Sequence, residues 1–153
     1  YIASNHDEVT TYGIVNTIGA WFRQDPRVDV DKSPISRKYF LFGKTLVCYA
    51  HGNTEKPLDG TKNKLSKMAA LMPVEAKQLW AQADYAEIHA AHFHSERSTD
   101  EVNGIITRRI SSPTAADTWT FKSGYIGAVR KAQTFLYDKE IGLLQIINTP
   151  VRR

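Results

Sequence analysis

The sequence predicts a single α/β domain over residues 1–153, and three observations lead to this fold class. Apolar residues recur at helical spacing near the N-terminus, apolar and aromatic runs in the middle predict strands alternating with helices, and strands dominate toward the C-terminus. The length is that of one ordinary domain. The 42% hydrophobic and 24% charged residues are typical of folded globular proteins, so we expect neither a disordered nor a fibrous chain.

The first predicted element is a helix over residues 8–22. Four apolar residues recur there at helical spacing: Ile14, Ile18, Trp21 and Phe22. Asp7 and Glu8 fall in the expected first turn, where carboxylates interact favourably with the helix dipole.

Two strands are predicted next, over Arg37–Phe42 and Thr45–Ala50, joined by a tight turn. The second strand is almost wholly apolar, as expected when both of its faces are covered. The single cysteine, Cys48, lies in it and is expected to be a small buried hydrophobe. One cysteine forms no intramolecular disulfide, which suits a reducing compartment and favours a cytoplasmic location.

Two short helices are expected over residues 61–70 and 74–83, separated by Pro73, which interrupts helices. Three lysines line the first of them and favour a solvated face, with contacts to a phosphate backbone as the alternative: Lys62, Lys64 and Lys67.

The rest of the chain is predicted to be mostly strands. The expected elements are strands over Tyr85–Ala91 and Gly104–Ile110, a loop over Ser111–Gly124, a helical turn over 125–132, and strands over Gln133–Tyr137 and Gly142–Ile147.

Histidines carry the functional signal, because several directly follow predicted strand ends. His51 follows one strand, and His92 and His94 follow another as an H-x-H pair whose side chains point to the same side of an extended segment. Neutral imidazole is a good ligand for Zn, Mn, Fe or Ni. Asn5 and His6 follow Tyr1–Ala3, which has the composition of a strand end, and an asparagine oxygen is a hard, neutral metal ligand.

Three motifs occur in order: Ser4-Asn5-His6-Asp7, Ala50-His51-Gly52 and Ala91-His92-Phe93-His94. They resemble the last three motifs of the calcineurin-like metallophosphoesterases, written G-N-H-[DE], G-H and G-H-x-H. The tail from Ser112 to Trp119, with Gly124 and Tyr125, is similar to phage-encoded members. The resemblance implies an αββα sandwich of two mixed sheets, in an enzyme that hydrolyses phosphate esters at a dinuclear metal centre.

The resemblance also implies a role for each residue. Asn5, His51 and His92 would bind one divalent metal (Mn, Zn, Fe or Ni), and His94 would bind a second. His6 would donate a proton or hydrogen bond near the phosphate and leaving group. Paired metals would polarise the phosphoryl oxygens and hold a hydroxide for in-line attack.

The sequence departs from the family pattern in two ways. Ser4 and Ala91 replace glycines, and the 153 residues contain neither D-x-H nor G-D, the motifs that supply an Asp and a His to one metal and the bridging Asp. Both motifs would precede Asn5, and Tyr1 has the character of a residue within a strand, so we expect an N-terminal part of the domain to be missing. This chain alone should then hold at most one metal well, through Asn5, His51 and His92.

Other side chains receive weaker assignments. His89 has the opposite parity to His92 along the strand, so we expect it to face away in a structural role. Arg108 or, by preference, Arg109 could bind a substrate phosphate through bidentate hydrogen bonds, with an exposed strand arginine as the alternative. Three aromatic residues favour packing over base stacking: Trp119, Phe121 and Tyr125. Nothing in the spacing supports Asp117 as a replacement carboxylate.

The net charge of +4 and a pI near 9.2 favour anionic partners. With the phage-like tail, this favours DNA or a nucleotide as substrate, in the host cytoplasm for a phage-encoded protein. No apolar run is long enough to span a membrane. An unpaired strand edge would favour homo-oligomers or association with the missing segment. Two alternatives remain open: a non-catalytic binding domain of the same fold, and a mononuclear zinc module built on His51, His92 and His94.

Overall fold

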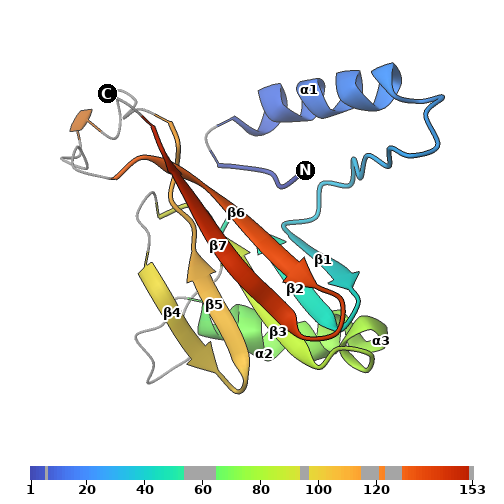
Figure 1. Cartoon of the computed structure of the whole chain (residues 1–153). Helices are drawn as coiled ribbons and strands as arrows, with labels where there is room; N and C mark the ends of the chain where they lie inside the picture. Colours follow the sequence, from blue (N-terminus) through green and yellow to red (C-terminus); the bar gives the residue numbers. More distant parts are fainter. Residues whose placement is uncertain (6, 54–64, 94–96, 115–120, 123–128, 152–153) are drawn as a thin grey trace.

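The computed structural model describes residues 1–5, 7–53, 65–93, 97–114, 121–122 and 129–151. It confirms the predicted α/β class: a five-stranded mixed sheet, a two-stranded antiparallel sheet, and helices beside them (Figure 1). Among the residues so described, no helix is long and apolar enough to cross a membrane.

The elements in chain order are α1 (Glu8–Trp21), β1 (Arg37–Phe42), β2 (Thr45–Ala50), α2 (Ser66–Glu75), α3 (Lys77–Trp80), β3 (Tyr85–Ala90), β4 (Arg97–Val102), β5 (Ile105–Arg109), β6 (Lys131–Asp138) and β7 (Gly142–Pro150).

The larger sheet has the strand order β1-β2-β3-β5-β4. Its three central strands, β2, β3 and β5, run parallel, and β1 and β4 are antiparallel edges. Ala50, Ala90 and Arg109 end the three parallel strands in register. Because the carboxyl ends of parallel strands meet at one edge of a sheet, the loops that follow them share that edge.

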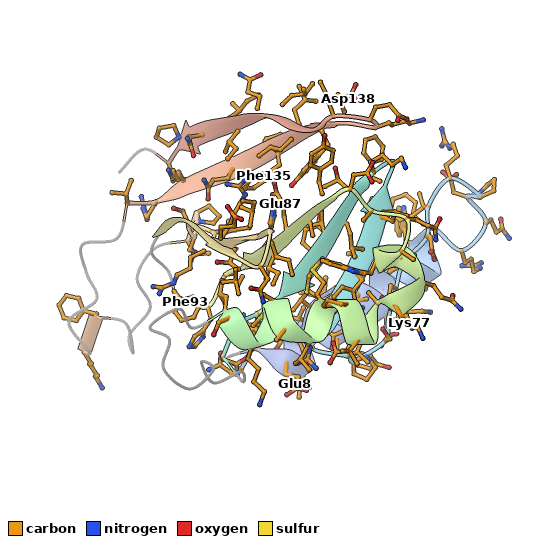
Figure 2. All side chains as sticks on the ribbon, turned by 90° about the horizontal axis from the view of Figure 1, so that it is seen from below. Glu8, Lys77, Glu87, Phe93, Phe135 and Asp138 are labelled. Carbon is orange, nitrogen blue, oxygen red and sulfur yellow. The ribbon has the colours of Figure 1, made fainter. Side chains whose placement is uncertain are left out.

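The hydrophobic core lies between the larger sheet and α2. Inward residues of β2 and β3 pack with Leu65, Met68, Ala69 and Met72, and Cys48 is fully buried there, as expected. On the opposite face, the β6–β7 hairpin covers the sheet. Figure 2 shows the layers from the side, with Glu87 and Phe135 between sheet and hairpin, and Phe93 toward α2.

The prediction that Pro73 separates two helices is wrong. Helix α2 continues through Pro73 to Glu75, and the break falls at Ala76, before the short α3. A proline removes one backbone hydrogen bond, but Met68 and Met72, which lie one turn apart just before Pro73, are fully buried. Tertiary packing therefore outweighs the local preference. Residues 61–64, with Lys62 and Lys64, lie outside the described ranges, and Lys67 is exposed as expected.

Strand β4, which pairs with β5 in a hairpin, is not predicted by the sequence pattern. Its residues, Arg97–Val102, are mostly polar and give no apolar alternation. A signal was nevertheless present in the Asn103-Gly104 dipeptide, since both residues have positive φ, 52° and 78°. Asn-Gly is a strong indicator of a tight hairpin turn.

The C-terminal strands exist as predicted, but they are longer. Lys131 and Ala132 pair with Pro150 and Thr149, so the helical turn expected over 125–132 is wrong at its C-terminal end. Residues 123–128 lie outside the described ranges. In the expected loop, Ser111–Thr114 is irregular, whereas the backbone at 121–122 is helical.

Helix α1 forms at the predicted place, but its apolar residues do not enter a core. Trp21 is 81% exposed and Ile14 is 55% exposed, while Val15 is the buried residue of the helix. Figure 1 shows α1 set apart from both sheets. The preceding Tyr1–Ala3 pairs with no strand among the described residues, which corrects the expected strand end, and the Tyr1 amino group donates to the Asp31 carbonyl.

Candidate metal centre

The ends of β2 and β3 bring His51 and His92 together. Ala50 and Ala90 are register partners at the two strand ends, so each histidine follows directly in the adjoining loop. The His51 carbonyl accepts backbone hydrogen bonds from Ala91 (3.2 Å) and His92 (2.8 Å), which hold the two loops side by side. The imidazole rings lie edge to face, with centroids 4.9 Å apart.

Asn5 joins this pair from the segment that precedes α1. Its Oδ1 lies 2.7 Å from Nε2 of His51, and the same nitrogen lies 3.1 Å from Nδ1 of His92. Asn5 is exposed and both histidines are partly buried, so the three atoms converge at the rim of the sheet, open to solvent. The structure thus brings together three residues separated by as many as 87 positions in the chain.

The hydrogen bonds within this arrangement depend on the protonation state of Nε2 of His51. An imidazole nitrogen carries either one proton or one lone pair, and an amide oxygen only accepts. If Nε2 of His51 is protonated, Asn5 and an unprotonated Nδ1 of His92 share that single proton. If it is not, its lone pair faces the oxygen of Asn5 at 2.7 Å. Turning the amide round would let its N–H₂ group donate to that lone pair, with Nδ1 of His92 facing the same nitrogen either as a second donor or as a second lone pair.

Two of the separations among these three atoms can be compared with the spacing of ligands around one cation. Two ligands about 2.1 Å from one ion, at tetrahedral or octahedral angles, lie about 3.0–3.4 Å apart. The 3.1 Å between His51 and His92 falls in this range. The 2.7 Å to Asn5 is slightly short of it, and the exposed amide has room to rotate. Two imidazoles and an amide oxygen suit Mn, Zn, Fe or Ni.

Phe93 and Gly52 close one side of the cluster. Gly52 has φ +98°, and a Cβ there would lie 3.1 Å from the Ala90 Cβ and 3.3 Å from the Phe93 ring. The Phe93 ring packs edge to face against His92, with centroids 5.6 Å apart. The Arg109 guanidinium lies over the same ring, 4.4 Å from its centroid. The sequence predicts no role for Phe93, because a phenylalanine between two histidines gives no signal of its own.

The remaining predicted site residues have separate outcomes. His6 and His94 lie outside the described ranges, as do Asp117, Trp119 and Tyr125, so the histidine-only zinc module is not assembled from described residues. Phe121 is 66% exposed, which does not support packing in the core. Within the described ranges, no three His, Cys, Asp or Glu side chains form a group that could hold a metal, and the cluster above includes an amide instead.

His89 lies on the other face of the sheet, as predicted, in a buried polar network. Glu87 accepts hydrogen bonds from Nε and Nη2 of Arg108 (2.9 and 3.1 Å) and from the Tyr137 hydroxyl (3.0 Å). Nε2 of His89 lies 3.0 Å from Oε2 of the same carboxylate. The His89 ring packs against the ring of Phe135, with ring centroids 4.4 Å apart. This network joins the β6–β7 hairpin to the sheet.

Two pKa values in the network reflect these contacts. Burial raises the pKa of the Glu87 carboxyl, but hydrogen bonds from His89 and Arg108 and the charge of Arg108 outweigh it and lower the pKa to about 2. Burial and the neighbouring Glu87 charge raise the pKa of Tyr137 above its usual range. Glu87 is therefore ionised, and Tyr137 is a hydrogen-bond donor, at neutral pH.

A comparison with solved structures gives a distant likeness. No family model matches the chain, and no curated protein matches it. A crystal structure of a single-mutant Vps29 from Entamoeba histolytica is similar over 78% of this chain, with 15% sequence identity and a TM-score of 0.46. The match covers 64% of that protein, so this chain spans less than two thirds of its length.

Proposed function

We propose that this chain contributes part of the metal centre of a metal-dependent phosphoesterase, in which Asn5, His51 and His92 hold one divalent cation. One observation carries the proposal: Oδ1 of Asn5 and Nδ1 of His92 lie 2.7 and 3.1 Å from the same nitrogen of His51. The three motifs that supply these residues occur in the order of the metallophosphoesterase pattern.

The chain's own residues would each have a defined task. His51 and His92 would supply neutral nitrogen ligands, and Asn5 would add a neutral oxygen. A bound divalent cation would withdraw charge from a phosphoryl oxygen and activate a water molecule. His94 as a ligand to a second metal, and His6 as a donor to the leaving group, belong to the same proposal.

The substrate class is a phosphomonoester or phosphodiester. The net charge of +4 supports an anionic substrate such as DNA or a nucleotide. Phage origin, a cytoplasmic setting and association of the chain with itself are further proposals from the sequence pattern.

Titration calorimetry with Mn²⁺ and with Zn²⁺ tests the metal site. We expect one tight site, whose metal affinity falls at least about 10–100-fold in Asn5→Ala, His51→Ala or His92→Ala. Removing a metal ligand should reduce the affinity at least as much as removing a residue that hydrogen-bonds to a ligand. Asn16→Ala, on α1, is the matched control and should bind like the wild type. Two tight sites on this chain, or unchanged affinity in all three variants, would refute the proposal.

The second candidate is a metal-binding domain of the same architecture without hydrolase activity. It is favoured by one observation, the absence of D-x-H and G-D from these 153 residues. Mn²⁺ binding without hydrolysis of p-nitrophenyl phosphate or its bis ester would support it. Reading the encoding gene upstream of Tyr1 separates the two candidates, because both motifs within about 80 residues would support the enzyme. The zinc module predicts unchanged metal affinity in Asn5→Ala.

A further inference from the structure

We propose that one side of α1 is the contact surface of a symmetric dimer of this chain, in which the α1 helices of two copies pack antiparallel. Six exposed residues form this surface, the α1 face: Gly13, Ile14, Thr17, Ile18, Ala20 and Trp21. The inference does not depend on the metal centre. It gives self-association of the chain a surface and a geometry.

The α1 face is uncovered, whereas the opposite side of the helix is packed. Three apolar residues recur on the face at i, i+4 and i+7 and are 55%, 41% and 81% exposed, in order: Ile14, Ile18 and Trp21. On the opposite side Val15 is buried, and the Lys32 side chain lies against Gly19. The helix also stands apart from both sheets (Figure 1). Contiguous exposed apolar surface marks a contact site.

The absence of charge on α1 points to a protein partner. No charged residue occurs from Val9 to Phe22. A helix whose outer side faces water carries charged or polar residues there, and a helix that lies on a membrane carries Lys or Arg on its polar side. The one hydroxyl of the α1 face, on Thr17, donates to the Gly13 carbonyl at 3.0 Å, so it does not require water. The face is therefore suited to another apolar protein surface.

The α1 face is complementary to itself in shape. Its largest side chain, Trp21, lies toward one end and Gly13 toward the other, where no atom lies within 4 Å of an added Cβ. A two-fold axis between Thr17 and Ile18 would pair the two halves of the face. Trp21 of one copy then lies opposite Ile14 of the other, because both are equally far from the axis. Each indole would enter the space beside Gly13 as a knob enters a hole, twice per dimer.

The charges that flank α1 favour antiparallel over parallel packing. Asp7 and Glu8 lie at the N-terminal end of the helix. Arg23 follows the C-terminal end, where its Nη1 donates to the neutral Ala20 carbonyl at 3.0 Å. Antiparallel helices bring the acidic end of each copy toward Arg23 of the other, whereas parallel helices bring like charges together. Exposed ion pairs contribute little affinity, so these charges select the orientation and the apolar face supplies the attraction.

The length of the helix predicts a reversible dimer. Helix α1 has 14 residues, which corresponds to about 21 Å at 1.5 Å per residue. A contact of this length buries less than the roughly 1,200–2,000 Å² of a stable interface, and contacts of that size are weak, so we expect a dissociation constant of about 10–100 µM.

Sedimentation velocity of the whole chain over about 5–500 µM tests the dimer. The sedimentation coefficient should rise with concentration, and Ile14→Glu should weaken association at least about tenfold, because a charge would enter an apolar contact. Val74→Glu places the same charge at a 73% exposed apolar position of α2 and should leave association unchanged. Gly13→Leu should also weaken the dimer by filling the space for Trp21, although leucine favours the helix itself. Circular dichroism confirms that each variant is folded.

Disulfide cross-linking tests the orientation in a Cys48→Ala background. Ile14→Cys and Trp21→Cys, mixed and mildly oxidised, should form a cross-linked dimer, whereas either variant alone should not. A disulfide requires Cα atoms within about 7 Å, which antiparallel packing provides for this pair alone. Cross-linking within each single variant, and not in the mixture, would show parallel helices and overturn the proposed geometry.

Four outcomes would overturn the dimer itself. They are a monomer up to the highest concentration, species that grow beyond a dimer, wild-type association in Ile14→Glu, and a monomer that co-sediments with phosphatidylcholine vesicles. A longer product of the same gene that stays monomeric, and in which Ile14→Glu lowers the melting temperature, would show that the chain covers the face itself and would also overturn the inference. Mn²⁺ binding tests the proposed function separately, so either can fail without the other.

Discussion

The carboxylate of Glu87 provides the sharpest stability test, because its side chain is 7% exposed and joins two layers of the fold. Glu87→Gln keeps the shape but replaces one charged oxygen with an amide donor that faces the donors of Arg108. Breaking a buried ion pair by removing one partner costs about 3–5 kcal/mol. The side chain of Arg108 is 15% exposed and the glutamine oxygen still accepts a bond, so we expect a loss of about 3 kcal/mol.

Urea unfolding followed by circular dichroism measures this loss, and the melting temperature should fall by about 6–12 °C for a chain of this size. Replacing both partners with apolar residues, as Glu87→Leu with Arg108→Met, should cost less than Glu87→Leu alone, because no unpaired charge stays buried. A loss below about 1 kcal/mol for Glu87→Gln would refute the reasoning. A loss in the double variant equal to the sum of the losses in Glu87→Leu and Arg108→Met measured singly would also refute it.

The same carboxylate predicts a pH dependence. Its pKa is about 2 in the folded chain, against an ordinary value of 4.5. A lowered pKa means that Glu87 contributes its stability above pH 4.5 and loses it as the pH falls toward 2. The difference in unfolding free energy between wild type and Glu87→Gln should therefore shrink over this window. A difference that stays constant from pH 6 to about 2 would contradict the assignment.

Three further substitutions test local features. Gly43→Ala should cost about 3 kcal/mol in urea unfolding, because φ is +55° and a Cβ would overlap the backbone of the β6–β7 turn, whereas Gly104→Ala, with φ +78° and open space, should cost about 1 kcal/mol; equal losses would exclude the steric cause. Gly52→Ala should lower the unfolding free energy by about 2 kcal/mol, because Gly52 has φ +98°. It should also weaken Mn²⁺ binding in calorimetry, because Gly52 directly follows His51. Unchanged Mn²⁺ affinity would show that the conformation at Gly52 does not position His51 for metal binding. Tyr39→Phe removes a 2.6 Å hydrogen bond to Glu75 and should lower the unfolding free energy by about 1 kcal/mol, and no measurable change would show that water replaces the bond.

Local patterns in the sequence predicted most elements, and the errors have physical causes. Pro73 predicted a break, but burial of the neighbouring methionines keeps α2 continuous. The apolar stripe of α1 correctly predicted a helix, although Trp21 and Ile14 are exposed. The polar strand β4 gave no apolar pattern, and only its Asn103-Gly104 turn indicated a hairpin. Periodicity reports the local backbone, whereas burial depends on what packs against it.

The candidate site shows the same division between sequence and structure. The residue types, their motif order and their positions after strand ends are properties of the sequence, and they predicted Asn5, His51 and His92 as ligands of one metal. Their convergence on one nitrogen depends on the parallel register of β2 and β3 and on the path of the segment before α1. Only the tertiary structure placed Arg108 against Glu87, Arg109 against Phe93, and Phe93 against His92. Contacts between residues distant in the chain depend on strand pairing and packing, which one-dimensional spacing does not contain.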